Sequence, residues 1–155
     1  MSRPHADPRL VAGVAAGGAL GTLARYGLSH ALPPMVGWPV ATLTENLLGA
    51  FLLGLLLEAL GRGGAETPRR RWLRLTLGTG VLGGFTTYSA LALETHGLLA
   101  GGRVGAALGY ALLTVVGGTA TCLAGVALAA RRHSGGGRAV PQDPEAAAVE
   151  DGARS

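Results

Sequence analysis

The sequence has few charged residues for its length, and it contains no lysine. Charged side chains make up 14% of the 155 residues, against about 25% in an average soluble domain. All of the basic charge is arginine, and the arginines lie beside apolar runs. The net charge of +4 and the pI of about 10.2 therefore indicate positively charged flanks of membrane spans, and not a protein that binds nucleic acid.

The sequence also lacks the groups that most enzyme and metal sites need. Cys122 is the only cysteine, so no disulfide can form within the chain. Glu94 and His96 are two residues apart, which places them on different faces of a helix. Residues 78–83 match the dinucleotide-binding pattern GxGxxG, but no strand precedes them and they lie in an apolar run, so the match is accidental. We expect a protein that is not an enzyme.

Four apolar runs are each long enough to cross a hydrocarbon core, which needs about 20 helical residues. They cover approximately residues 10–32, 38–60, 72–100 and 104–130. We therefore expect an all-α membrane protein with three parts, namely a short N-terminal segment (1–8), a four-helix transmembrane domain (9–130) and a tail (131–155). The tail is rich in glycine, alanine and acidic residues, which predicts disorder.

Glycine and threonine interrupt the third apolar run. Four glycines between residues 78 and 84 are followed by Thr86 and Thr87, which is a poor sequence for a continuous helix. A broken transmembrane helix is tolerated where its freed backbone lines a cavity or meets protein. Such breaks recur as ion-binding sites, because they present bare carbonyls and amides. The sequence therefore predicts that the third helix is broken within the membrane. Elsewhere, glycines spaced by four, such as Gly13, Gly17 and Gly21, predict close helix packing.

Three motifs resemble, in the same order, those of the fluoride-channel family known as Fluc or CrcB. They are the glycine-rich run 17–26 that ends in Arg-Tyr, the run TLTENLLGAFLLG at 42–54, and GGFTTYS at 83–89. The resemblance extends over about residues 9–130. It implies a fluoride-selective channel subunit in the cell membrane, which lets fluoride leave the cytoplasm passively. It also implies an antiparallel dimer of four-helix subunits with a structural sodium ion at its centre.

The resemblance assigns the sodium ion to particular atoms. The backbone carbonyls of Gly83 and Thr86 would hold it, and backbone oxygen is a suitable ligand for a hard cation. Arg25, near the end of the first span, has two possible roles. It either lies at a vestibule of the channel or extends to the membrane surface as a long cationic side chain.

The fluoride path implied by the resemblance uses Asn46, Tyr88, Ser89 and Thr114. Fluoride is small and tightly hydrated, so a pore must replace its water shell with hydrogen-bond donors. An amide, an aromatic ring edge and hydroxyl groups can supply them. Two alternatives stay open. Asn46 can form an interhelical hydrogen bond, and Thr114 can donate to a carbonyl of its own helix.

The sequence departs from the family pattern at three positions. In the family pattern, two aromatic residues three positions apart on the third helix belong to the fluoride path. Tyr88 takes the first position here, but Leu91 takes the second and Ala90 replaces a threonine, so one of the two aromatic rings is missing. Glu45 stands beside Asn46, where the family usually has an uncharged residue. A carboxylate within a span costs several kcal/mol unless it is paired, protonated or hydrated, and by default it marks function. Because of Glu45, a small proton-coupled exporter is an alternative function. A non-transporting membrane scaffold is a further alternative.

The arginines are distributed unequally between the two ends of the predicted spans. Arginine in short loops favours the cytoplasmic side, which predicts that both termini are cytoplasmic. An antiparallel homodimer needs copies in both orientations. The bias therefore favours pairing with a homologous chain of opposite arginine bias, with a homodimer as the alternative. The predicted cytoplasmic side holds Arg3, Arg9, Arg62, Arg69, Arg70, Arg71, Arg74, Arg131, Arg132 and Arg138, whereas the opposite loops hold only Arg103.

Overall fold

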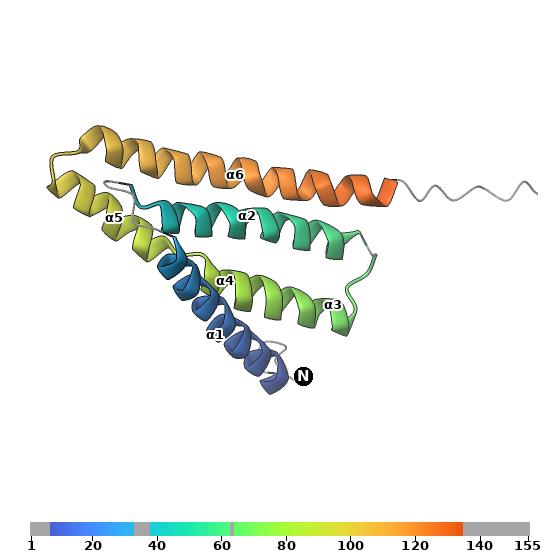
Figure 1. The fold of residues 1–155 in the computed structure, drawn as a ribbon. Helices are drawn as coiled ribbons and strands as arrows, with labels where there is room; N and C mark the ends of the chain where they lie inside the picture. The colour runs from blue at the N-terminus through green and yellow to red at the C-terminus, as the bar shows by residue number, and fades with distance from the viewer. Residues whose placement is uncertain (1–6, 33–37, 63, 135–155) are drawn as a thin grey trace, which may run out of the picture.

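The structure, a computed structural model, describes residues 7–32, 38–62 and 64–134. Long helices lie side by side in this part of the chain, and α1 crosses the others at an angle (Figure 1). The elements are α1 (Pro8–Ala31), α2 (Val40–Gly61), α3 (Pro68–Leu73), the π-helix η1 (Arg74–Leu82), α4 (Gly83–Phe85), α5 (Tyr88–Ala100) and α6 (Val104–Ser134). The all-helical class is as predicted. Residues 1–6 and 135–155 lie outside the described part, and α6 continues beyond the predicted end of the fourth run.

Local sequence signals explain where the helices begin. The Asp7 carboxylate accepts a hydrogen bond from the Arg9 N–H at 2.9 Å, and a proline follows Asp7 at the first helical position of α1. Thr67 caps α3 in the same way, by accepting from the Arg70 N–H at 3.3 Å. The turn between α5 and α6 contains Gly102 at φ +73°, a conformation that glycine adopts at little cost.

Glycines allow α1 to pack closely against η1 and α4. Gly17 and Gly21 are buried on α1, and a Cβ atom added to Gly21 would overlap the Val81 carbonyl oxygen. The same arrangement joins α2 to α6, where a Cβ atom on Gly54 would overlap the Cys122 carbonyl. The contacts of Gly17 and Gly21 confirm the packing predicted from the glycine spacing on α1.

Two helices in the described part, α2 and residues Val104–Arg131 of α6, are long and apolar enough to cross a membrane. Helix α1 is also long, with 24 residues, but its many glycines and polar side chains lower its hydropathy. Large apolar side chains of α6 face outward, among them Leu112, Val116 and Leu123, which are 62–63% exposed. Such surfaces suit lipid or another apolar helix better than water.

The third predicted run is divided in the structure. Helix α4 ends at Phe85, and Thr86 (ψ 156°) and Thr87 (φ −148°, ψ 125°) are extended before α5 begins at Tyr88. The interruption therefore falls at the paired threonines. The π-helix before it was not predicted. Its wider turns end with the Gly83 N–H donating to the Gly78 carbonyl, five residues earlier.

Candidate functional site

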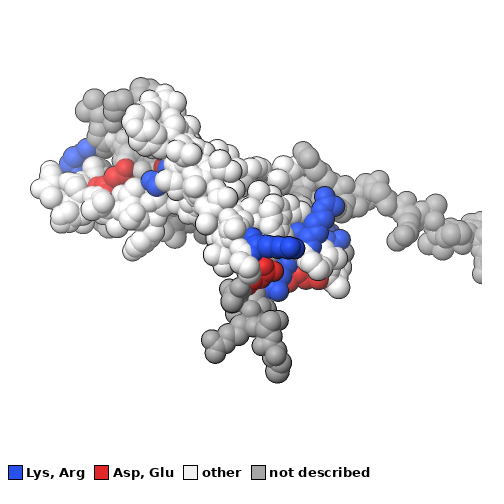
Figure 2. Space-filling model, turned by 90° about the horizontal axis from the view of Figure 1, so that it is seen from below, with Lys and Arg blue, Asp and Glu red and all other residues white. Residues whose placement is uncertain are grey.

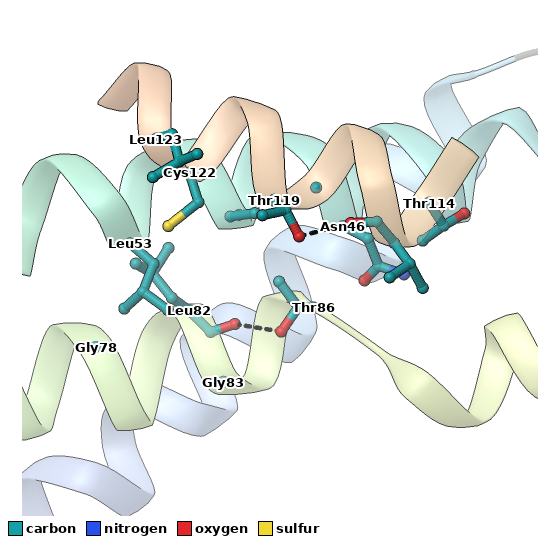
Figure 3. A pocket seen from close by; sticks show the side chains of 14 residues that line it. Asn46, Leu53, Gly78, Leu82, Gly83, Thr86, Thr114, Thr119, Cys122 and Leu123 are labelled. Atoms are coloured by element: carbon teal, nitrogen blue, oxygen red, sulfur yellow. Dashed lines mark hydrogen bonds between the residues drawn. The ribbon is translucent and has the colours of Figure 1, made fainter. Parts of the chain in front are cut away.

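A groove of about 510 Å³ lies between α2, the η1–α4 segment and α6 (Figure 3). Asn46, Gly83, Thr86 and Thr114 line it together, although they come from three separate parts of the sequence. Glycine, alanine, valine and leucine residues make up most of the remaining lining, together with Thr119 and Cys122, so the polar groups are few and stand in a mainly apolar wall. This combination is typical of binding sites for small ligands and ions.

Asn46 holds the extended segment between α4 and α5. Its Nδ2 donates to the Thr87 carbonyl at 2.9 Å, and its Oδ1 accepts from the Thr87 N–H at 2.8 Å. The interhelical hydrogen bond that the sequence left open is therefore present. A side-chain amide has two N–H bonds and only one donates to Thr87, so Asn46 retains a second donor beside the groove.

The interruption releases two carbonyl groups from their usual helical donors. In a continuous helix, the Thr87 N–H would donate to the Gly83 carbonyl, but it donates to Asn46 instead. The Ala90 N–H would donate to the Thr86 carbonyl, but it donates to the Thr87 Oγ1 at 3.2 Å. The carbonyl oxygens of Gly83 and Thr86 therefore lack the N–H donors that a continuous helix would provide, and both residues line the groove. Within the described residues, no group of three or more His, Cys, Asp or Glu side chains is placed to hold a metal ion.

Most hydroxyl groups near the groove donate to backbone carbonyls. Thr114 donates to the Tyr110 carbonyl at 2.8 Å, which is the alternative that the sequence left open. Thr119 donates to Val115 at 2.8 Å, and Thr86 donates to Leu82 at 3.0 Å (Figure 3). Each of these hydroxyls must rotate before it can donate to a bound anion.

Two residues expected on the fluoride path lie outside the groove of this single chain. Tyr88 is 82% exposed and Ser89 is exposed, and neither lines the groove. The Ser89 hydroxyl shares a hydrogen bond of 3.2 Å with the Thr87 hydroxyl. Their outward position at the start of α5 leaves both side chains accessible to a neighbouring molecule.

Arg25 lies at the end of α4. Its Nε donates to the Gly84 carbonyl at 3.3 Å, and the Thr22 hydroxyl reaches the same oxygen at 3.5 Å. A cation at the C-terminal end of a helix compensates the partial negative charge of the last carbonyls. This half-buried contact is a structural role for Arg25, and it differs from an extension to the membrane surface.

The two acidic residues singled out by the sequence are part of a polar cluster away from the groove lining. Glu45 is only 1% exposed and accepts from the Ser29 hydroxyl at 2.6 Å. Glu94 accepts from the Thr42 hydroxyl at 2.8 Å and from the Tyr110 hydroxyl at 2.6 Å. The sequence gave no sign of these partners, because they come from different helices.

The sequence matches a known protein family. Residues 12–126 match the family described as CrcB-like protein, Camphor Resistance (CrcB). The chain belongs to the CrcB family. The match runs from the first turns of α1 to near the end of α6, so it includes every residue of the groove described above.

Several CrcB relatives have been named by function. The chain is 50% identical over 126 residues to "Fluoride-specific ion channel FluC 2" of Leifsonia xyli subsp. xyli, covering 81% of this chain and 87% of the relative. It is 46% identical over 121 residues to "Fluoride-specific ion channel FluC" of Deinococcus radiodurans, covering 76% and 93%. A relative from Cutibacterium acnes, "Fluoride-specific ion channel FluC 1", is 46% identical over 126 residues, covering 81% and 87%. These CrcB proteins are named as ion channels and not as enzymes.

Proposed function

We propose that this CrcB chain is a subunit of a fluoride-selective channel through which fluoride leaves the cytoplasm passively. The observation that carries the proposal is the Asn46 amide, which lines the groove and has an N–H not used in holding Thr87. The names of the CrcB relatives support fluoride as the ion. Thr114 adds a hydroxyl to the same groove, which can donate to an anion once it rotates away from the Tyr110 carbonyl, and apolar residues surround both groups.

Passive flow is sufficient for export. Fluoride enters cells from acidic surroundings as neutral HF, which dissociates inside, and the anion then leaves down its own gradient. A proton-coupled exporter using Glu45 is less well supported, because Glu45 is buried against Ser29 and does not line the groove. A non-transporting scaffold would not need the donors that line the groove.

Selective electrogenic efflux is the first expected result. Proteoliposomes that contain this CrcB chain and a suitable partner chain should release fluoride when valinomycin balances the charge with potassium, and they should retain chloride. A fluoride electrode and a chloride electrode measure the two ions in parallel. Equal chloride efflux, or fluoride efflux that requires a proton gradient, would contradict the channel proposal.

We further propose that a sodium ion binds at the Gly83 and Thr86 carbonyls. These oxygens have lost the donors of a continuous helix, as a hard cation requires. The residues of this chain would supply oxygen ligands and hold the α4–α5 interruption in shape, and the ion would supply positive charge there. Replacing sodium by N-methylglucamine on both sides of the liposomes should slow efflux, and unchanged efflux would argue against the ion.

The proposed assembly is an antiparallel dimer of four-span subunits in the cell membrane, with α3–η1–α4 and α5 together forming the third, interrupted span. The exposed Tyr88, and Leu91 and Ala90 in place of an aromatic and a hydroxyl residue, support a partner that supplies the missing groups. The arginine bias supports one orientation, with both termini in the cytoplasm. A homologous chain of opposite arginine bias is therefore the proposed partner, and a homodimer is the alternative.

The chain expressed alone should insert in one orientation and show little fluoride efflux. Cysteine labels at each terminus in a Cys122→Ala background report the sidedness, and the efflux assay reports the activity. Co-expression with a homologous chain of opposite bias should restore efflux. Labels on both sides together with full activity from the single chain would establish the homodimer instead.

A further inference from the structure

The end of the bundle where α2 ends and α3 begins carries a surplus of positive charge. Figure 2 shows basic side chains gathered there, with carboxylates among them. Among the described residues, this end carries seven arginines and three carboxylates, so its net charge is positive whichever ion pairs form. These are Arg9, Arg62, Arg69, Arg70, Arg71, Arg74 and Arg131, with Asp7, Glu58 and Glu66.

Three consecutive arginines of α3 point in three directions, because neighbouring residues on a helix are about 100° apart. Arg70 lines a pocket against the end of α2. Arg71 lines a different pocket, beside Asp7 and the start of α1. Arg69 is exposed and lines neither pocket. Arg69 and Arg70 are therefore neighbours with equal charge and different surroundings.

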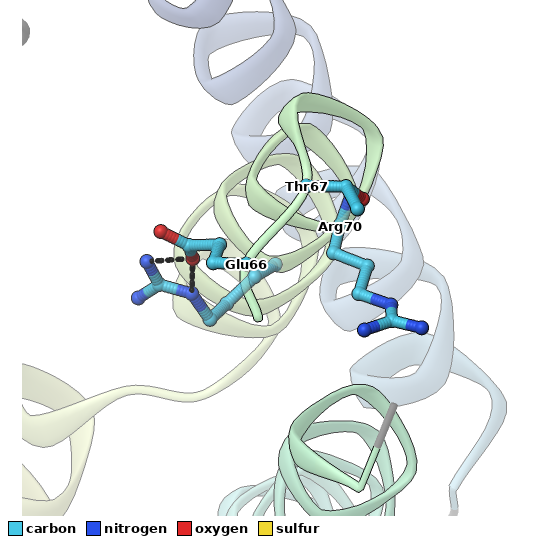
Figure 4. A network of polar contacts seen from close by, with 4 residues as sticks. Glu66, Thr67 and Arg70 are labelled. Carbon is cyan, nitrogen blue, oxygen red and sulfur yellow. Dashed lines mark hydrogen bonds and ion pairs between the residues drawn. The ribbon is translucent and has the colours of Figure 1, made fainter. Parts of the chain in front are cut away.

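The pocket beside Arg70 has an apolar floor and a charged rim. Its volume is about 130 Å³, and Leu57 and Leu60 of α2 contribute apolar wall. On one side of the rim, the Glu66 Oε1 accepts hydrogen bonds from the Arg74 Nη2 at 2.6 Å and from the Arg74 Nε at 3.0 Å. Arg70 extends on the other side (Figure 4). With two arginines and one glutamate among the lining residues, the pocket carries a net positive charge, which favours an anionic ligand.

This pocket lies at a membrane surface in the proposed channel. It adjoins the last turn of α2, one of the two helices long and apolar enough to span a membrane. Trp72, 43% exposed, is two residues from Arg70, and tryptophan is enriched at the headgroup level of bilayers. The leucines would face acyl chains and glycerol, while the arginine would face headgroups.

We propose that this pocket binds the phosphate of an anionic phospholipid in the cytoplasmic leaflet. The Arg70 Nη1 donates to the Ala65 carbonyl at 3.3 Å, which fixes the guanidinium at the rim. A guanidinium has five N–H donors in a planar fork that matches phosphate oxygens. Leu57 and Leu60 favour a phosphate that carries an apolar glycerol backbone over a free phosphate ion. The inference rests on the membrane placement under the proposed function, but not on fluoride conduction.

The test measures lipid retained by the purified full-length protein, so it does not depend on ion flow. Protein extracted from membranes in neutral detergent is mixed with equal amounts of phosphatidylglycerol and phosphatidylcholine, and bound lipid is counted by native mass spectrometry. Arg70→Gln is compared with Arg69→Gln, its neighbour outside the pocket. Gly61→Leu is a second variant, because a Cβ atom at Gly61 meets nothing within 4 Å and a leucine there would fill the pocket.

The unmodified protein should retain phosphatidylglycerol in preference to phosphatidylcholine. Arg70→Gln should lower that retention roughly fivefold, the contribution of one arginine near an anionic surface, and Gly61→Leu should lower it to a similar extent. Arg69→Gln should change it by less than about twofold. Equal losses in the two arginine variants would indicate diffuse attraction and would overturn the site. Displacement of the lipid by millimolar inorganic phosphate would overturn the lipid as its occupant.

Discussion

Replacing Asn46 by leucine is expected to reduce fluoride efflux by about 100-fold or more. A change of this size corresponds to about 2.7 kcal/mol in the barrier for transport. Leucine suits a membrane helix but offers neither the second amide N–H of this groove-lining residue nor the two hydrogen bonds to Thr87. The measurement is the initial rate of fluoride efflux from liposomes at matched protein density.

Two further variants test whether efflux depends on the Asn46 amide. Asn46→Asp keeps an oxygen that can accept from the Thr87 N–H, but it has no amide donor and adds a negative charge, so it should also fail to conduct. Thr44→Val on the same helix is the matched control, because the Thr44 hydroxyl donates to the Val40 carbonyl of its own helix and Thr44 does not line the groove. Normal efflux through Asn46→Leu would show that the amide is not part of the path.

Replacing Gly21 by leucine is expected to prevent stable folding of the subunit. A side chain there would overlap the backbone of Val81 and approach Phe85, and a backbone atom cannot move aside as a flexible side chain can. Overpacking alone typically costs 1–3 kcal/mol, and separating α1 from η1 would cost more. The yield of monodisperse protein in detergent and its thermal midpoint measure the loss.

Gly27→Leu is the control for this substitution, because it lies on the same helix and nothing lies within 4 Å of an added Cβ atom. It should fold and assemble normally, since it introduces the same apolar side chain into open space. If both glycine variants gave the same yield and thermal midpoint, close packing between α1 and η1 would not be what makes Gly21 necessary.

The sequence predicted the helical class, and it placed a break of the third span close to Thr86 and Thr87, where the backbone is extended, because both depend on local composition. Long apolar runs predict helices, and the glycines before Thr86 and Thr87 mark the place where a helix is weakest. Four of the residues that the family resemblance implied as functional, Asn46, Gly83, Thr86 and Thr114, line one groove. Their positions along the chain did not indicate this arrangement.

The partners that polar side chains find on neighbouring helices could not be predicted from the sequence. An interhelical hydrogen bond of Asn46 was one of two alternatives, but its partner Thr87 was not foreseen, and neither were the contacts of Glu94 with Thr42 and Tyr110. These pairings depend on the rotation of each helix about its axis, which one amphipathic pattern does not fix when most faces are apolar. Tyr88 was expected on the path, and in the single chain it faces outward.

The bonds between Asn46 and Thr87 have an evolutionary consequence. Both partner atoms on Thr87 belong to the backbone, and every residue type except proline carries the same N–H and C=O groups. A change at position 46 therefore cannot be rescued by a compensating side chain at position 87. Whatever constraint this contact imposes on sequence divergence falls on position 46 alone, and the two positions need not covary.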